Sequence, residues 1–147
     1  MPITGTALAF VAAFGALVFL NYVIQTTFVP SLASDYDEAN GPLLAALTMS
    51  NPSSLGWGLE MWGYGLLGVA TWLVAPVFQG SRLERATYFA FVANGPLSIV
   101  PAFLTALRPR WVLTASGLLS FALWNLLVVV MSVLSLLVFR KRASARQ

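Results

Sequence analysis

The feature that most constrains this chain is a set of four long apolar stretches with almost no charge. They cover about residues 5–29, 55–78, 86–107 and 111–139. A helix needs about 20 mostly apolar residues to cross a bilayer, so each stretch is long enough. Charged residues make up only 9% of the chain, against about 25% in a typical soluble domain. The sequence therefore predicts an all-α, polytopic membrane protein, with four transmembrane helices in an up-down bundle that forms one domain over residues 1–147.

The basic residues predict how these spans are oriented. The connection at 79–85 carries Arg82 and Arg85, and the tail at 140–147 carries Arg140, Lys141, Arg142 and Arg146. Because Lys and Arg are enriched on the cytoplasmic side, we expect both termini in the cytoplasm and the protein in the plasma (inner) membrane. Arg108 and Arg110 oppose this rule. The tail is typical of an anchor on anionic lipid headgroups, and we expect no nucleic-acid partner.

The first connection, at about residues 30–54, is the one long loop. An apolar run at 43–49 follows Asn40 and Gly41, and Pro42 suits the first turn of a helix. The pattern predicts a short amphipathic helix on the outer face of the bundle or in the headgroup zone. Two interpretations stay open: a lid or partner-docking element, or a connector that follows the membrane surface.

Acidic side chains in the same loop begin a calcium-binding pattern without completing it. Asp35 and Asp37 alternate as calcium ligands do, and Glu38 follows them. Ala39 stands where a third ligand belongs, and no Glu follows at the required distance. We expect no metal site here.

The absence of two residue types excludes much chemistry. The chain has no Cys and no His. Disulfides, thiolate catalysis, iron–sulfur clusters, His-ligated haem and His-based acid–base catalysis are therefore excluded. A lipid, a quinone or a pigment held without such ligands stays open as a bound molecule. A single carboxylate within the spans supplies few groups for catalysis, and we expect that the protein is not an enzyme.

Glu60 is the one ionisable acid or base inside a predicted span, which makes it a candidate functional residue. Helical spacing puts Gly56, Glu60 and Gly63 on one stripe, with Trp57 and Tyr64 beside it. The glycines allow another helix to approach closely, so this stripe should face the bundle.

No basic residue is expected at the depth of Glu60. Its carboxyl is then either protonated or paired with a cation from a substrate, a proton in transit or another subunit. The structural alternative is a neutral Glu60 that hydrogen-bonds Asn21, Gln25 or a carbonyl. Ser98 comes near the same level and completes a predicted outer polar cluster, whereas Asn94 lies deeper. Trp62 and Tyr64 flank Glu60, which suggests either an aromatic belt or a cage for a lipophilic cation.

Small residues and prolines mark two further features. Gly5, Ala9 and Ala13 recur at intervals of four and predict a helix-packing seam, as Gly56 and Gly63 do in the second span. In the third span, the candidate kink residues are Gly95, Pro96 and Pro101.

Two functions from different classes follow. The first is a small, non-enzymatic membrane protein that binds or scaffolds a partner subunit, lipid or hydrophobic cofactor, with membrane lipids, other membrane subunits or a second copy as partners. The second is a small proton- or cation-coupled transporter that uses Glu60. In architecture alone, the chain resembles the small multidrug transporters, which also have four short helices and one essential membrane Glu. It departs from them in its long first loop and in carrying the carboxylate in the second span.

Overall fold

The computed structural model describes residues 2–145, and these residues form helices with no β-strand among them. The all-α prediction is therefore confirmed for this part of the chain, while Arg146 lies outside it. The elements in chain order are α1 (Pro2–Val23), η1 (Ile24–Phe28), α2 (Val29–Ser34), α3 (Gly41–Leu47), α4 (Leu55–Val74), η2 (Ala75–Val77), α5 (Arg82–Leu107), η3 (Pro109–Leu113) and α6 (Ala115–Ser144).

The first three elements form one continuous rod. η1 is a π-helical turn, in which the Val29 N–H donates to the Ile24 carbonyl. This wide turn directly precedes Pro30, which has no N–H to continue an α-helix and would crowd the carbonyl four residues back. The rod continues to Ser34, beyond the end predicted near Val29. The loop is correspondingly shorter than expected.

Hydroxyl side chains set where the next three long helices begin. Ser54 caps α4 by accepting from the Trp57 N–H, and Thr114 caps α6 by accepting from the Gly117 N–H. Ser81 and Glu84 form a capping box at the start of α5. The fourth predicted span began near Trp111, but that residue lies in η3, and the long helix starts only after the Thr114 cap.

Three helical segments are long and apolar enough to cross a membrane: Thr4–Ser34, Arg82–Leu107 and Ala115–Ser144. α4 is not among them. Its glycines, its tryptophans and Glu60 lower its mean hydropathy. The composition of α4 thus reflects contacts with other helices more than contact with lipid.

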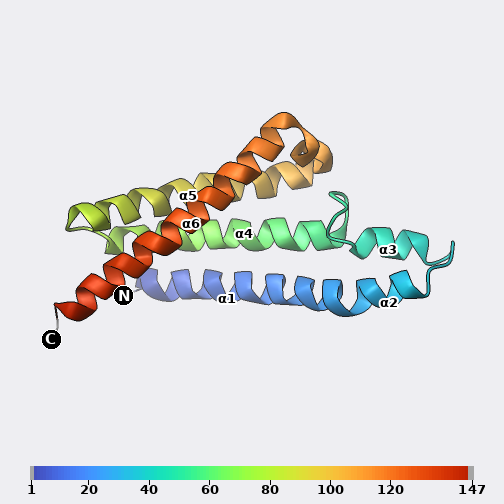
Figure 1. Cartoon of the computed structure of the whole chain (residues 1–147), viewed down its shortest axis with the longest axis horizontal. Helices are drawn as coiled ribbons and strands as arrows, with labels where there is room; N and C mark the ends of the chain where they lie inside the picture. Colours follow the sequence, from blue (N-terminus) through green and yellow to red (C-terminus); the bar gives the residue numbers. More distant parts are fainter. Residues whose placement is uncertain (1, 146–147) are drawn as a thin grey trace.

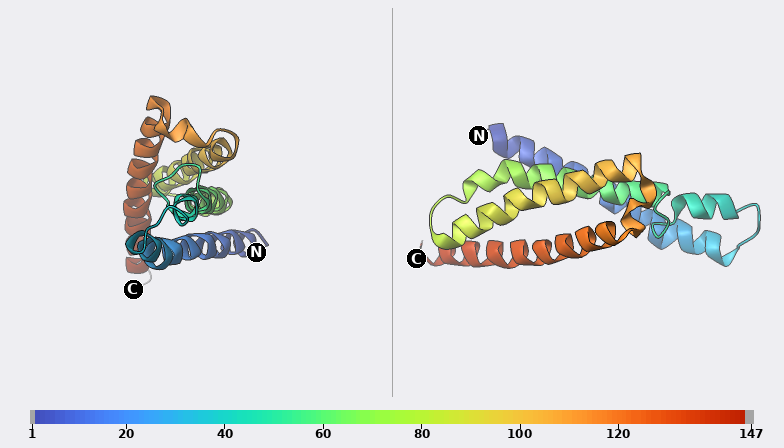
Figure 2. Two further views of the ribbon diagram at one scale, coloured as in Figure 1. Left: turned by 90° about the vertical axis from the view of Figure 1, so that its right-hand side faces the viewer. Right: turned by 90° about the horizontal axis from the view of Figure 1, so that it is seen from above.

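The long helices alternate in direction (Figure 1). Both described chain ends and the η2 turn lie at one end of the molecule, called here the terminal end. α3 and η3 lie at the opposite end, called the loop end (Figures 1 and 2). α4 packs between α1 and α5, so these three helices form a layer. α6 packs mainly on α5 and crosses this layer at an angle.

One side chain fastens α6 at the terminal end. Arg142 makes an ion pair with Glu84, 2.8 Å between Nη2 and Oε1, and donates to the Val77 carbonyl at 3.1 Å. Its guanidinium also lies 5.8 Å from the centre of the Phe78 ring. α6 is therefore joined to both α5 and η2 where the helices end.

The outward faces of the long helices are apolar. Leu8 and Phe19 on α1, and Leu126 and Val129 on α6, are each 60% exposed or more. Soluble proteins seldom expose contiguous apolar surface of this kind, whereas lipid tails solvate it. The surface and the three apolar helices are compatible with a membrane protein.

Candidate functional site

The glycines of α4 divide between two faces of that helix. Gly63 lies against α1, where an added β-carbon would come within 2.9 Å of Val18 Cγ2. Gly68 lies against α5, where an added β-carbon would come within 2.7 Å of Ser98 Cβ. Each neighbouring helix therefore approaches the α4 backbone closely, and polar groups on either side can reach it.

Glu60 lies on the α1 side of α4 and belongs to a partly buried polar group, the Glu60 cluster: Asn21, Gln25, Met49, Glu60 and the Leu47 carbonyl. Asn21 is fully buried and donates from Nδ2 to Glu60 Oε2 at 2.9 Å. Glu60 itself is 9% exposed. No ion pair in the described part of the chain includes Glu60, so its carboxyl is held by an amide and not by a cation.

Gln25 joins this cluster to the loop. Its Nε2 donates to Asn21 Oδ1 at 3.2 Å and to the Leu47 carbonyl at 2.9 Å, and its Oε1 accepts from the Met49 N–H at 2.9 Å. Gly56 makes room for these contacts, because a β-carbon there would overlap the Leu47 oxygen. The π-turn that contains Gln25 thus fixes the connection between α3 and α4 onto the rod.

A second polar group, the Asn94 cluster, joins α4, α5 and α6. Trp124 Nε1 donates to Ser98 Oγ at 2.9 Å, Ser98 Oγ donates to Asn94 Oδ1 at 3.2 Å, and Asn94 Nδ2 donates to Thr71 Oγ1 at 3.0 Å. The Thr71 hydroxyl in turn donates to the Gly68 carbonyl. The sequence predicted one outer polar cluster that contains both Ser98 and Glu60. The structure separates them, because Ser98 on α5 lies on one side of α4 and the Glu60 carboxyl faces α1 on the other.

α5 runs without a break through Gly95, Pro96 and Pro101. Pro96 has no N–H to donate to the Val92 carbonyl. The indole Nε1 of Trp72 on α4 donates to that carbonyl instead, at 2.5 Å. The Trp72 ring lies so close to Gly95 that a β-carbon there would overlap it. Gly95 and Pro96 therefore form the surface that receives Trp72.

The aromatic residues near Glu60 contact other rings. Tyr64 packs against Phe14 and Trp124, with ring centres 5.3 and 4.7 Å apart. Trp62 packs edge-on against Phe103 of α5 at 5.3 Å and is 40% exposed. Trp57 Nε1 is buried without a hydrogen-bond partner. Trp62 thus faces α5 while the Glu60 carboxyl faces α1, and the two do not form the cage considered from the sequence.

The seam predicted on α1 faces away from the other helices. Gly5, Ala9 and Ala13 are all exposed, and an added β-carbon on Gly5 would meet no atom within 4 Å. The side of α1 that packs on α4 instead buries Ala7, Val18 and Asn21.

One of the acidic loop residues, Asp37, stabilises the backbone of the loop. Asp37 Oδ1 accepts from the Asn40 N–H at 2.6 Å and so shapes the turn that precedes α3. The described residues contain no group of three or more acidic, His or Cys side chains that could hold a metal ion.

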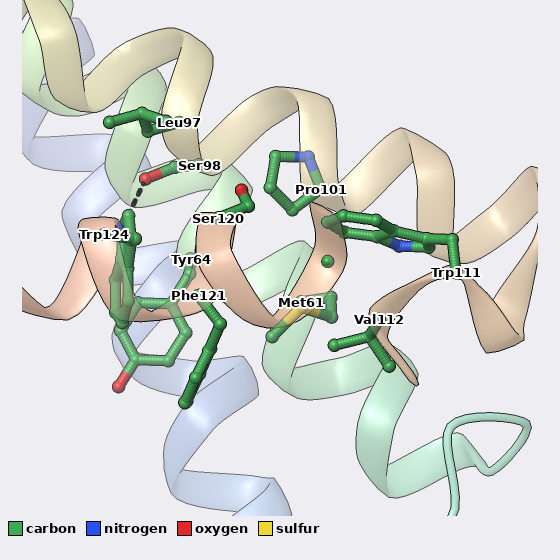
Figure 3. A pocket seen from close by; sticks show the side chains of 11 residues that line it. Met61, Tyr64, Leu97, Ser98, Pro101, Trp111, Val112, Ser120, Phe121 and Trp124 are labelled. Atoms are coloured by element: carbon green, nitrogen blue, oxygen red, sulfur yellow. Dashed lines mark hydrogen bonds between the residues drawn. The ribbon is translucent and has the colours of Figure 1, made fainter. Parts of the chain in front are cut away.

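A small, partly open space lies between α4, α5, η3 and the start of α6 (Figure 3). Its walls include Met61, Tyr64, Trp111, Phe121 and Trp124. Its volume is about 30 Å³, which is enough for water-sized molecules and too small for an organic ligand.

A larger space, called here the lateral groove, is open and is bounded by all four long helices. Its volume is about 440 Å³, within the usual range for sites of small organic molecules. Its surface is almost wholly apolar, with Thr71 and Asn94 as the buried polar pair. The residues that line it are Val11, Leu67, Ala70, Thr71, Val74, Phe91, Asn94, Val128, Met131, Ser132 and Ser135.

Sequence reasoning missed Trp72, Trp124 and the loop groups around Met49. A signal for Trp72 was present: Pro96 frees the carbonyl four residues before it, and a buried carbonyl needs a donor. The Leu47 carbonyl and the Met49 N–H carry no such signal, because every residue has these backbone groups.

Comparison of the chain with known protein families, with curated proteins and with solved structures finds no match.

Proposed function

We propose that this chain is an integral membrane protein with four spans, located in the plasma (inner) membrane with both termini in the cytoplasm. α4 lies between α1 and α5, both of which belong to segments apolar enough to cross the bilayer, and its direction alternates with theirs. The bases at the terminal end, on α5 and α6, outnumber Arg108 and Arg110 at the loop end. In this arrangement α3 lies in the outer headgroup zone.

Within this arrangement, the protein is non-enzymatic and binds a hydrophobic molecule, a lipid or an apolar cofactor, in the lateral groove. The observation that carries the proposal is the groove itself, an open apolar surface with a few polar groups in its wall. The Asn94 and Thr71 side chains hydrogen-bond each other, so these polar groups of the wall need no partner from a ligand. A membrane-spanning segment of a partner subunit would compete for the same surface.

The test is to fill the groove from α6. Ser132 lines the groove, whereas the adjacent exposed Val133 does not. We expect Ser132→Trp to abolish co-purification of a bound apolar molecule, measured by mass spectrometry of a mild-detergent extract. Val133→Trp is the matched control and should retain it. Equal retention by both variants would contradict binding in the groove.

The alternative function is a small proton- or cation-coupled transporter that uses Glu60. It is supported by the buried carboxyl, whose hydrogen-bond partner in the Glu60 cluster is a neutral amide and not a cation. Glu60→Gln separates the two functions, because the Gln carbonyl still accepts from Asn21 Nδ2. If the protein is a coupled transporter, Glu60→Gln should abolish proton-driven uptake in vesicles. A structural Glu60 predicts unchanged stability and unchanged binding in the groove.

A further inference from the structure

The loop end carries a basic pocket that the proposed function does not use. It lies where α5 ends and α6 begins, and its volume is about 700 Å³. Arg108 and Arg110 line it together with three hydroxyl residues, Ser53 before α4 and Thr114 and Ser116 at the start of α6. Segments far apart in the sequence thus bring two guanidinium groups and three hydroxyls to one pocket.

The charge of this pocket is not neutralised within the described chain. The one ion pair among those residues joins Arg142 to Glu84 at the other end of the molecule. Arg108 and Arg110 are both exposed. They are also the two bases that oppose the charge distribution of the other connections, which argues for a specific anionic counterpart at this position.

The start of α6 adds to the positive potential. Thr114 and Ser116 share a hydrogen bond of 3.0 Å between their hydroxyl oxygens, beside the N-terminal end of a 30-residue helix. That end carries the positive side of the helix dipole, which favours phosphate groups. Arginine side chains add donors whose forked geometry matches phosphate oxygens.

Part of the pocket wall is apolar. Leu104 and Trp111 line it next to the arginines. Leu104 belongs to the last turn of α5, at the end of a segment apolar enough to span. Basic, polar and apolar residues thus line one pocket at the end of this segment, and together they match a molecule with a phosphate head and hydrocarbon tails.

We infer that this pocket binds the headgroup phosphate of an anionic phospholipid. The guanidinium groups of Arg108 and Arg110 contact the phosphate oxygens, the hydroxyls of Ser53, Thr114 and Ser116 complete the polar side, and the acyl chains leave past Leu104. The pocket lies at the loop end, whereas the lateral groove lies toward the terminal end. Failure of one site therefore leaves the other intact.

The experiment measures binding of phosphatidylglycerol and phosphatidylcholine to the full chain in mild detergent by native mass spectrometry. We expect a tight phosphatidylglycerol site that Arg108→Gln with Arg110→Gln weakens about tenfold, the effect of losing charged hydrogen bonds. Arg108→Lys with Arg110→Lys keeps the charge and should weaken it less. Unchanged affinity in the Gln double variant, or equal affinity for phosphatidylcholine, would overturn the inference.

The matched control is Arg82→Gln with Arg140→Gln. These two arginines are exposed at the terminal end and do not line the pocket. The control should leave the tight site within about twofold of the unmodified chain, because contacts of single exposed charges are weak. A tenfold loss of phosphatidylglycerol affinity in the control would mean that surface charge in general causes the effect, and it would overturn the inference. A second experiment adds inorganic phosphate as a competitor of bound phosphatidylglycerol. If phosphate fails to displace the lipid, the result supports a lipid ligand. Complete displacement would overturn the assignment to a lipid.

Discussion

At the scale of single residues, the glycines of α4 decide which groups meet. Gly56 and Gly63 open the face toward α1, where Glu60 finds Asn21, while Gly68 opens the face toward α5. Small residues on two sides of one helix let it pack closely between two neighbours without the volume of large side chains. The buried polar residues then lie near helix backbones, where they find partners.

Gly68→Ala tests this close packing. The added β-carbon would lie 2.7 Å from Ser98 Cβ, and overpacking of this kind costs about 1–3 kcal/mol. We expect that loss in the free energy of unfolding, measured by circular dichroism in mixed micelles. Gly58→Ala is the control on the same helix, since its β-carbon meets nothing within 4 Å. It should be neutral or stabilising by up to about 1 kcal/mol, the difference in helix propensity. Equal losses in both variants would contradict the packing argument.

Part of the Glu60 cluster was predictable from the sequence. Asn21, Gln25 and Glu60 fall at similar depth if their spans are antiparallel, and the structure brings these three together. Ser98 falls at a similar depth as well, yet it belongs to the Asn94 cluster. Depth follows from counting residues along a span, whereas direction around the helix axis depends on which neighbours pack on each side. One sequence with glycines on both faces does not determine that direction.

At the scale of elements, α5 shows how a proline is accommodated inside a long helix. Pro96 removes a donor from α5, and Trp72 of α4 supplies one to the Val92 carbonyl. The compensation lies in a different helix, so the hydrogen bond also fixes α4 and α5 at one register. The π-turn in η1 is the corresponding device on the rod, before Pro30. The positions of the prolines are evident in the sequence, but the indole donor that Trp72 supplies to the Val92 carbonyl depends on tertiary packing.

A double-mutant cycle measures this compensation. Trp72→Phe removes the indole N–H and leaves the Val92 carbonyl without its donor, which should lower the free energy of unfolding by about 1 kcal/mol. In a Pro96→Ala background the N–H of the new residue can donate to the same carbonyl. There we expect the effect of Trp72→Phe to fall by at least half. The same loss in both backgrounds would mean that the Trp72 ring, and not its N–H, supplies the stability.

At the scale of the whole molecule, the alternating helices and the distribution of bases support the membrane topology proposed above. The lengths of the apolar stretches predicted the long helices, and the caps at Ser54, Ser81 and Thr114 mark where three of them begin. The crossing of α6 over the layer was not predictable, because its apolar residues surround the helix and favour no single contact face.

The absence of native cysteine makes this topology directly measurable. Single variants Ser50→Cys, Gln79→Cys and Ser144→Cys place a thiol at exposed positions before α4, after α4 and at the end of α6. A membrane-impermeant maleimide should label Ser50→Cys in intact cells, and the other two only after permeabilisation. Labelling of Ser50→Cys and Gln79→Cys from the same side would show that α4 does not cross the membrane.

The place of α6 in the chain has a consequence for how the lateral groove is made. The layer of α1, α4 and α5 is complete in sequence before α6 begins, and α6 then docks on α5 and is fastened by Arg142 at its far end. In the proposed four-span arrangement, the groove would therefore gain its last wall during biosynthesis, after the other three helices are in the bilayer. A molecule already bound to the exposed layer would then gain its contacts with α6 as translation ends.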